Sequence, residues 1–166
     1  MGSKVCCAPM PDTASDLLAP AAPQTPIDAV IDTQVVMDWL VFDDARVQPL
    51  VQALQAGQLR WIGRLRMLEE LRHVLGRGVA ARYAPDLARI EQAFAEHCLM
   101  IETEPAPAVR MVCRDPNDQM FIDLALAQRA RWLFSRDRAV LALAKRARAQ
   151  GVEILTPEAW VKRMQA

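Results

Sequence analysis

Acidic side chains are the residues of this sequence whose types and spacing could do chemistry. The stretch "CRDPNDQMFIDLALAQ" (113–128) places Asp115, Asp118 and Asp123 close together. Asp32 ends the apolar run "IDAVID", and Asp137 lies in "FSRDRAV". Carboxylates that share a site repel one another and raise each other's pKa unless a cation lies between them. If these acids converge, they predict a site for a hard divalent cation with oxygen ligands, Mg²⁺ or Mn²⁺.

Other catalytic and metal-binding patterns are missing from the sequence. His73 and His97 stand alone, and the four cysteines form neither a CxxC pair nor a disulfide framework. Serine nucleophile elbows, P-loops and GxGxxG fingerprints are also absent. A phosphatase with an aspartyl nucleophile would need Asp-x-Asp after the first strand, where Gln34 takes the second position. A phospho-receiver would need two acids there and a late lysine, and neither is present.

Strand and helix patterns that must position the acids alternate along the chain. Short apolar runs at 27–32, 59–63, 98–102, 131–135 and 152–156 predict five strands. Helical patterns cover about 33–42, 44–56, 64–76, 84–98, 116–128, 138–151 and 157–164. This alternation predicts right-handed βαβ crossovers and therefore a mainly parallel sheet with helices on both faces.

Four acids are expected at one edge of that sheet, because ligands bind at the carboxyl ends of parallel strands. Asp32 and Asp137 follow the first and fourth predicted strands. Asp118 opens the helix before the fourth strand, and Asp115 lies three residues earlier. Glu70, on the more buried side of the helix after the second strand, is the candidate for a fifth acid.

Each acid also has a purely structural interpretation. Asp118 suits the first turn of a helix by propensity, and Asp137 could cap the helix that follows it. Glu70 could form a surface ion pair with Arg66 or Arg72. The shared site is favoured because all of these acids are expected at the same sheet edge.

Length and composition predict a single soluble globular domain, since the chain has 166 residues, of which 52% are apolar and 24% charged. Residues 1–26, rich in Pro, Ala and Ser and without periodicity, predict a flexible tail, and 27–166 the folded domain. No apolar run approaches the about 20 residues of a membrane span, and no targeting leader is recognisable, so we expect a cytoplasmic protein without membrane association. Twenty basic and twenty acidic residues cancel, although 129–148 carries seven basic residues and only one acidic residue.

The order of five segments resembles the PIN-domain ribonucleases. These segments are "AVIDTQVV", "RMLEELRHVL", "CRDPNDQMFIDLALA", "RWLFSRDRAVLAL" and "GVEILTPEAW". The likeness runs from about Ile27 to Trp160 and is greatest to the branch identified with toxins of toxin–antitoxin systems. It implies a three-layer α/β/α sandwich with a central, mainly parallel five-stranded sheet, and metal-dependent cleavage of single-stranded or structured RNA.

Carried over residue by residue, the resemblance assigns catalysis and metal binding to four acids: Asp32, Glu70, Asp118 and Asp137. Asp115 matches the first acid of the family's "DPxD" run and is expected to be auxiliary. Ser135 matches the hydroxyl of the family's Thr/Ser-x-Asp motif. Gln34 replaces the asparagine that usually orients the site, which changes the geometry without removing a ligand. Asp123 lies about 500° of helix turn after Asp118 and faces either the site or solvent.

The resulting hypothesis is a divalent-metal-dependent endoribonuclease. A metal-bound water would attack the phosphodiester in line, and the family implies products with 5′-phosphate and 3′-hydroxyl ends. Arg114, Arg136 and Arg138, next to the acids in sequence, are the candidates for binding the RNA backbone, or else are solvated surface charges. The alternative is a non-catalytic PIN-like module that holds a partner protein or nucleic acid. An RNA substrate, an antitoxin chain and a second copy of this chain are the expected partners.

Overall fold

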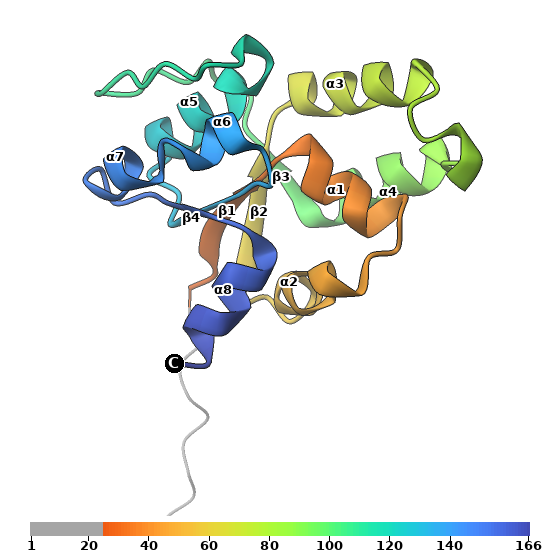
Figure 1. The fold of residues 1–166 in the computed structure, drawn as a ribbon, viewed down its shortest axis with the longest axis horizontal. Coiled ribbons are helices and arrows are strands. Elements are labelled where there is room, and N and C mark those ends of the chain that lie inside the picture. The colour runs from red at the N-terminus through yellow and green to blue at the C-terminus, as the bar shows by residue number, and fades with distance from the viewer. Residues whose placement is uncertain (1–24) are drawn as a thin grey trace, which may run out of the picture.

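The structure, a computed structural model, describes residues 25–166. Strands and helices alternate along the chain (Figure 1). In chain order the elements are β1 (Ile27–Ile31), α1 (Thr33–Leu40), the 3₁₀ turn η1 (Ala45–Val47), α2 (Gln48–Gln55), β2 (Leu59–Gly63), α3 (Leu65–Gly76), the 3₁₀ turn η2 (Ala81–Tyr83), α4 (Leu87–His97), β3 (Cys98–Met100), the 3₁₀ turn η3 (Pro116–Asp118), α5 (Gln119–Ala127), β4 (Trp132–Phe134), α6 (Arg138–Leu141), α7 (Ala144–Arg148), β5 (Glu153–Leu155) and α8 (Pro157–Met164).

All five strands of the described chain form one parallel sheet in the order β3-β2-β1-β4-β5. The central strand β1 pairs with β4 in a register that aligns Ile31 of β1 with Phe134 of β4. Because the chain runs β1 to β2 on one side and then returns to β4 on the other, the strand order reverses between β1 and β4. Ligand sites in such sheets lie at this reversal, at the carboxyl ends of the strands.

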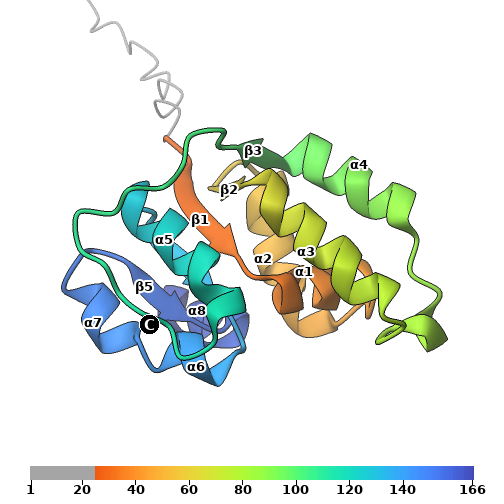
Figure 2. The ribbon, with the colours of Figure 1, turned by 90° about the horizontal axis from the view of Figure 1, so that it is seen from above.

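Helices cover both faces of the sheet, so the molecule has three layers (Figure 2). Ala29 and Ile31 of β1 belong to the core beneath α1–α4 and α8, whereas Val30 belongs to the core beneath α5–α7. Alternation of this kind follows from the two-residue period of a strand whose two faces are both buried. The predicted α/β/α sandwich on a mainly parallel five-stranded sheet is confirmed.

Some element boundaries differ from the sequence prediction. The helix expected over 138–151 is two short helices, α6 and α7, because Leu143 donates its backbone N–H to Val140 three residues earlier, a 3₁₀-type step. The helices expected over 44–56 and 116–128 each begin with a 3₁₀ turn. Gly57 follows α2 with a φ of 69°, a left-handed conformation that glycine adopts without steric cost.

Two expectations concern the ends of the chain and its environment. Of the predicted tail at 1–26, residues 1–24 lie outside the part of the chain that the structure describes. Among residues 25–166, no helix has the length and apolar character needed to cross a membrane. The cytoplasmic location and the boundary of the domain at residue 27 stay predictions.

Candidate active site

The pairing of β1 with β4 brings two functional segments together at the carboxyl edge of the sheet. Asp32 directly follows β1 and Ser135 directly follows β4. The backbone N–H of Asp32 still donates to Phe134 O, at 3.0 Å, so the ladder continues one step past the strand. The segment Ser135–Asp137 therefore starts beside Asp32, as the positions of the acids in the sequence predicted.

A cleft of about 400 Å³ opens at this edge. Its walls come from the start of α1, from α3, from the segment around η3 and from the start of α6. Five acids from these four segments line it: Asp32, Glu70, Asp115, Asp118 and Asp137. All four acids predicted to be catalytic, and the predicted auxiliary acid, thus surround one cavity.

Asp32 is the most deeply placed of these acids, with 3% of its surface exposed. Burial raises its pKa to about 6, and the nearby charge of Asp137 adds to the rise. Hydrogen bonds from the Ser135 hydroxyl and from the backbone N–H groups of Val35 and Arg136 act in the opposite direction. The carboxyl group is therefore held by the backbone N–H of Val35, has two further donor groups near it, and has its charge opposed by the low dielectric around it.

Ser135 connects the two acids that flank it in the fold. Its side chain is fully buried. The hydroxyl accepts the backbone N–H of Asp137 at 3.0 Å and lies close enough to Asp32 to lower the pKa of its carboxyl group. Since a hydroxyl has one proton and two lone pairs, it can serve both neighbours at once. This contact gives a physical role to the Ser-x-Asp motif that the resemblance had assigned.

Asp118 lies at the end of η3 and is half-buried. Burial raises its pKa to about 6, followed in effect by the charges of Asp137, Asp115, Asp32 and Glu70. Its carboxylate makes no capping hydrogen bond to α5. Asp118 thus lies at the start of the helical stretch, as its propensity predicted, but its carboxylate is not used for capping and is available to a ligand.

Capping does explain part of what three other acids do. Asp32, Asp115 and Asp137 accept backbone N–H groups of Val35, Asn117 and Ala139 at 2.9, 2.9 and 2.6 Å, each through Oδ1. A carboxylate offers about four acceptor positions on its two oxygens. The cap therefore fixes the orientation of each carboxyl group while leaving capacity for a cation.

Glu70 lines the cleft from α3 and is half-buried, whereas its neighbour Glu69 is exposed. Within the described chain Glu70 has no ion-pair partner. Arg72, one of the partners considered from the sequence, instead binds Glu91 at 2.6 Å. The structure thus leaves Glu70 free at the cleft, where it adds to the negative field that acts on Asp118.

The donor set suits a hard divalent cation, because every acidic ligand is a carboxylate oxygen. The Thr33 hydroxyl, also at the cleft, is buried and has no hydrogen-bond partner in the described structure. Among residues 25–166, however, no three acidic, histidine or cysteine side chains lie close enough to hold one metal ion. A cation bound at this cleft would therefore have to draw the carboxylates closer together.

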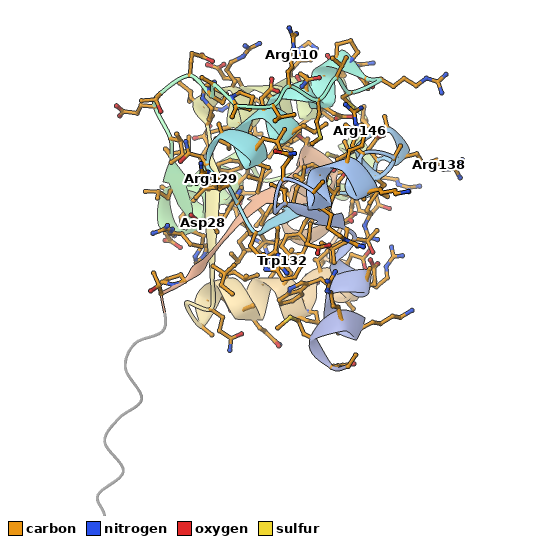
Figure 3. All side chains as sticks on the ribbon, turned by 90° about the vertical axis from the view of Figure 1, so that its left-hand side faces the viewer. Asp28, Arg110, Arg129, Trp132, Arg138 and Arg146 are labelled. Carbon is orange, nitrogen blue, oxygen red and sulfur yellow. The ribbon has the colours of Figure 1, made fainter. Side chains whose placement is uncertain are left out.

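The predicted RNA-binding arginines divide into two groups. Arg114 and Arg138 are exposed and line a neighbouring hollow of about 620 Å³, which shares Asp115 and Asp137 with the acidic cleft. Figure 3 shows the side chain of Arg138 extending away from the body of the molecule. Arg136, by contrast, is half-buried and its guanidinium binds two carboxylates. Its expected contact with RNA would require phosphate to compete with both.

Gln34 is exposed and lines the cleft, so the side chain that replaces the family's asparagine does reach the predicted site. Asp123 lies outside the acidic cleft. It accepts a hydrogen bond from Gln119 Nε2 at 2.8 Å and lines a separate, adjoining hollow. Sequence reasoning missed Thr33 and Asn117, which line the cleft; each is next to a predicted acid or between two of them, and that position is the only signal the sequence offers.

Comparison with known proteins agrees with this arrangement. The family model described as PIN domain matches residues 28–139, which span β1 to the start of α6 and include all five acids of the cleft. No curated protein sequence matches the chain. Because the matched segment is more than half of the chain, the chain belongs to the PIN-domain family.

Proposed function

We propose that this protein is a divalent-metal-dependent endoribonuclease that hydrolyses RNA phosphodiester bonds. PIN domains are generally nucleases, which supports a hydrolase that acts on nucleic acid. The observation that carries the proposal is the convergence of five carboxylates from four segments on one cleft. Two of them, Asp32 and Asp118, have their pKa raised to about 6, which is typical of acids at functional sites.

Asp32, Glu70, Asp118 and Asp137 would hold the cation, with Asp115 as an auxiliary acid. A divalent ion bound there lowers the pKa of water and neutralises charge on the reacting phosphate. The chain itself fixes two of these acids, since backbone N–H groups cap Asp32 and Asp137 and the Ser135 hydroxyl accepts the N–H of Asp137. At neutral pH a carboxyl group with a pKa of about 6 is mostly ionised, so Asp32 and Asp118 can both bind a cation.

Arg114 and Arg138 would bind the RNA backbone on the side of the cleft formed by η3 and α6. Their hollow adjoins the acidic cleft, so a chain whose scissile phosphate lies at the acids would pass its next phosphates beside these guanidinium groups. Neutralisation of phosphates by Arg and Lys supplies most of the sequence-independent affinity for nucleic acid.

The test is cleavage of a pool of labelled RNAs by the wild type in EDTA, Mg²⁺ or Mn²⁺, with two variants in parallel. Asp118→Asn should reduce cleavage by at least about 100-fold, because it removes an uncapped ligand. Asp123→Asn, five residues later in α5 and outside the cleft, should cleave normally, since asparagine can still accept from Gln119. Metal-independent cleavage, or equal activity of Asp118→Asn and the wild type, would refute the proposal. A matched DNA pool tests the preference for RNA.

The proposal extends to a role as the toxin of a toxin–antitoxin pair in the cytoplasm, supported by the sequence resemblance to that branch of the family. Induced expression in a bacterial host should arrest growth, and Asp118→Asn should not. Growth arrest that survives this substitution would instead favour the non-catalytic module that holds a partner. The antitoxin, a separate chain, and a homodimer are proposed partners; light scattering of the purified protein tests the dimer.

A further inference from the structure

Arg136 occupies a position that the RNA-binding prediction does not explain. Its side chain is 16% exposed and extends onto the α1 and α8 side of the sheet edge. Nε donates to Asp38 Oδ2 at 2.5 Å, and Nη1 donates to Glu158 Oε1 at 2.6 Å. Asp38 lies in the second turn of α1 and Glu158 in the first turn of α8. One guanidinium therefore joins two helices that follow different strands.

The main chain of the same residue contacts the acidic site directly. The backbone N–H of Arg136 lies close enough to the Asp32 carboxylate to lower its pKa. The Ser135 hydroxyl accepts the backbone N–H of Asp137 and also lies close enough to Asp32 to lower the pKa of its carboxyl group. Ser135–Asp137 thus places a donor group near Asp32 at each of its first two residues and the carboxylate of the site at its third.

Helix α1 contributes two residues to these contacts. Asp32 is its N-cap, and Asp38 lies six residues later in the same helix. A movement of Arg136 relative to Asp38 is therefore a movement of Ser135–Asp137 relative to the start of α1. Because Asp38 is buried and both Arg136 and Glu158 are half-buried, the geometry of a charge-assisted hydrogen bond is preferred there.

We propose that Arg136 is a positioning residue: by binding Asp38 and Glu158 it fixes the segment Ser135–Asp137, and with it the separation of the Asp32 and Asp137 carboxylates. This inference rests on the proposed function, because it concerns the same metal site. It replaces the role in RNA binding expected from the sequence. Residues that orient metal ligands from outside typically change metal affinity or activity by about 10–100-fold when they are substituted.

The positioning role and the RNA-binding role predict different kinetics. Loss of a phosphate contact weakens RNA binding, raises KM and lowers the salt dependence of binding. Loss of positioning lowers kcat and the affinity for Mn²⁺, while KM for RNA and its salt dependence stay within about two-fold of the wild type.

The test compares Arg136→Gln and Arg136→Lys with Arg163→Gln. Arg163 binds Glu153, a carboxylate that is as buried as Asp38, at 3.0 Å. Glu153 begins β5, at the amino end of the strands and away from the cleft. Asp38→Asn, which keeps a hydrogen-bond acceptor for Arg136, serves as the second, milder variant should Arg136→Gln fail to fold. Circular dichroism and urea unfolding establish the folded fraction, electron paramagnetic resonance measures free Mn²⁺, and initial rates give kcat and KM.

We expect Arg136→Gln to weaken Mn²⁺ binding and to lower kcat by about 10-fold or more, Arg136→Lys to recover part of both, and Arg163→Gln to change neither. Equal losses in the Arg136 and Arg163 variants at equal folded fraction, or a change confined to KM and salt dependence, would overturn the proposal. If the wild type binds Mn²⁺ but cleaves no RNA, the proposed function fails, and the Mn²⁺ affinities alone decide the positioning role. A wild type that binds no Mn²⁺ overturns both.

Discussion

Replacement of Asp32 by asparagine should stabilise the metal-free protein while it inactivates the site. Burial raises the pKa of Asp32 from 3.8 to about 6 in the folded chain. Between those two pH values the folded state binds more protons at this group than the unfolded state does. Stability conferred by the protonated carboxyl is therefore complete below about pH 3.8 and is lost as the pH rises through 6.

The size of this effect follows from the pKa difference. A pKa that is about two pH units higher in the folded state corresponds to about 3 kcal/mol of lost stability at neutral pH. Asparagine carries no charge and still offers Oδ1 to the backbone N–H of Val35, so the N-cap of α1 is kept. We expect Asp32→Asn to raise the free energy of unfolding at pH 7.5 by about 2–3 kcal/mol.

Urea unfolding in EDTA at several pH values between 4 and 8 measures this difference. The gap between variant and wild type should be small at pH 4 and should open above pH 6. Asp86→Asn is the matched control, since Asp86 is an exposed N-cap of α4 that accepts from Arg89 N at 3.1 Å; its stability should follow that of the wild type. Added Mn²⁺ should stabilise the wild type and leave Asp32→Asn unchanged. A variant less stable than the wild type at pH 7.5 in EDTA would refute the reasoning.

Three further outcomes are expected. Arg114→Ala and Arg138→Ala should each raise KM for RNA and reduce the slope of log affinity against log salt by about 1, as measured by binding at 50–200 mM salt; an unchanged slope contradicts a phosphate contact. Affinity for Mn²⁺ should fall about 10-fold or more from pH 7 to pH 5, because Asp32 and Asp118, each with a pKa of about 6, must lose their protons to bind the ion; an affinity that does not change with pH contradicts this. Glu70→Gln should reduce cleavage without loss of stability, whereas Glu69→Gln should leave cleavage unchanged; equal rates would exclude Glu70 from the site.

The sequence alone predicted the architecture and the edge at which the acids converge. Strand and helix periods are local properties, and alternation of five strands with helices admits few parallel topologies. Asp32 stands directly after β1, and Asp137 lies three residues after β4, so their place at the carboxyl edge follows once the strands are parallel. Glu70 lies inside a helix, where only its place on the more buried side made it a candidate, and the family's motif then assigned it to the site.

Only the tertiary structure decided which partner each charged group binds. Arg136 is adjacent to Asp137 in sequence, yet its guanidinium binds Asp38, 98 residues away, rather than solvent or a ligand. From the sequence, Asp123 could face either the site or solvent. In the structure it accepts a hydrogen bond from Gln119 and lines a different hollow. Several basic residues could pair with a given carboxylate from the sequence alone. Which of them does so depends on burial and on distances between segments far apart in the chain. Periodicity carries no information on either quantity.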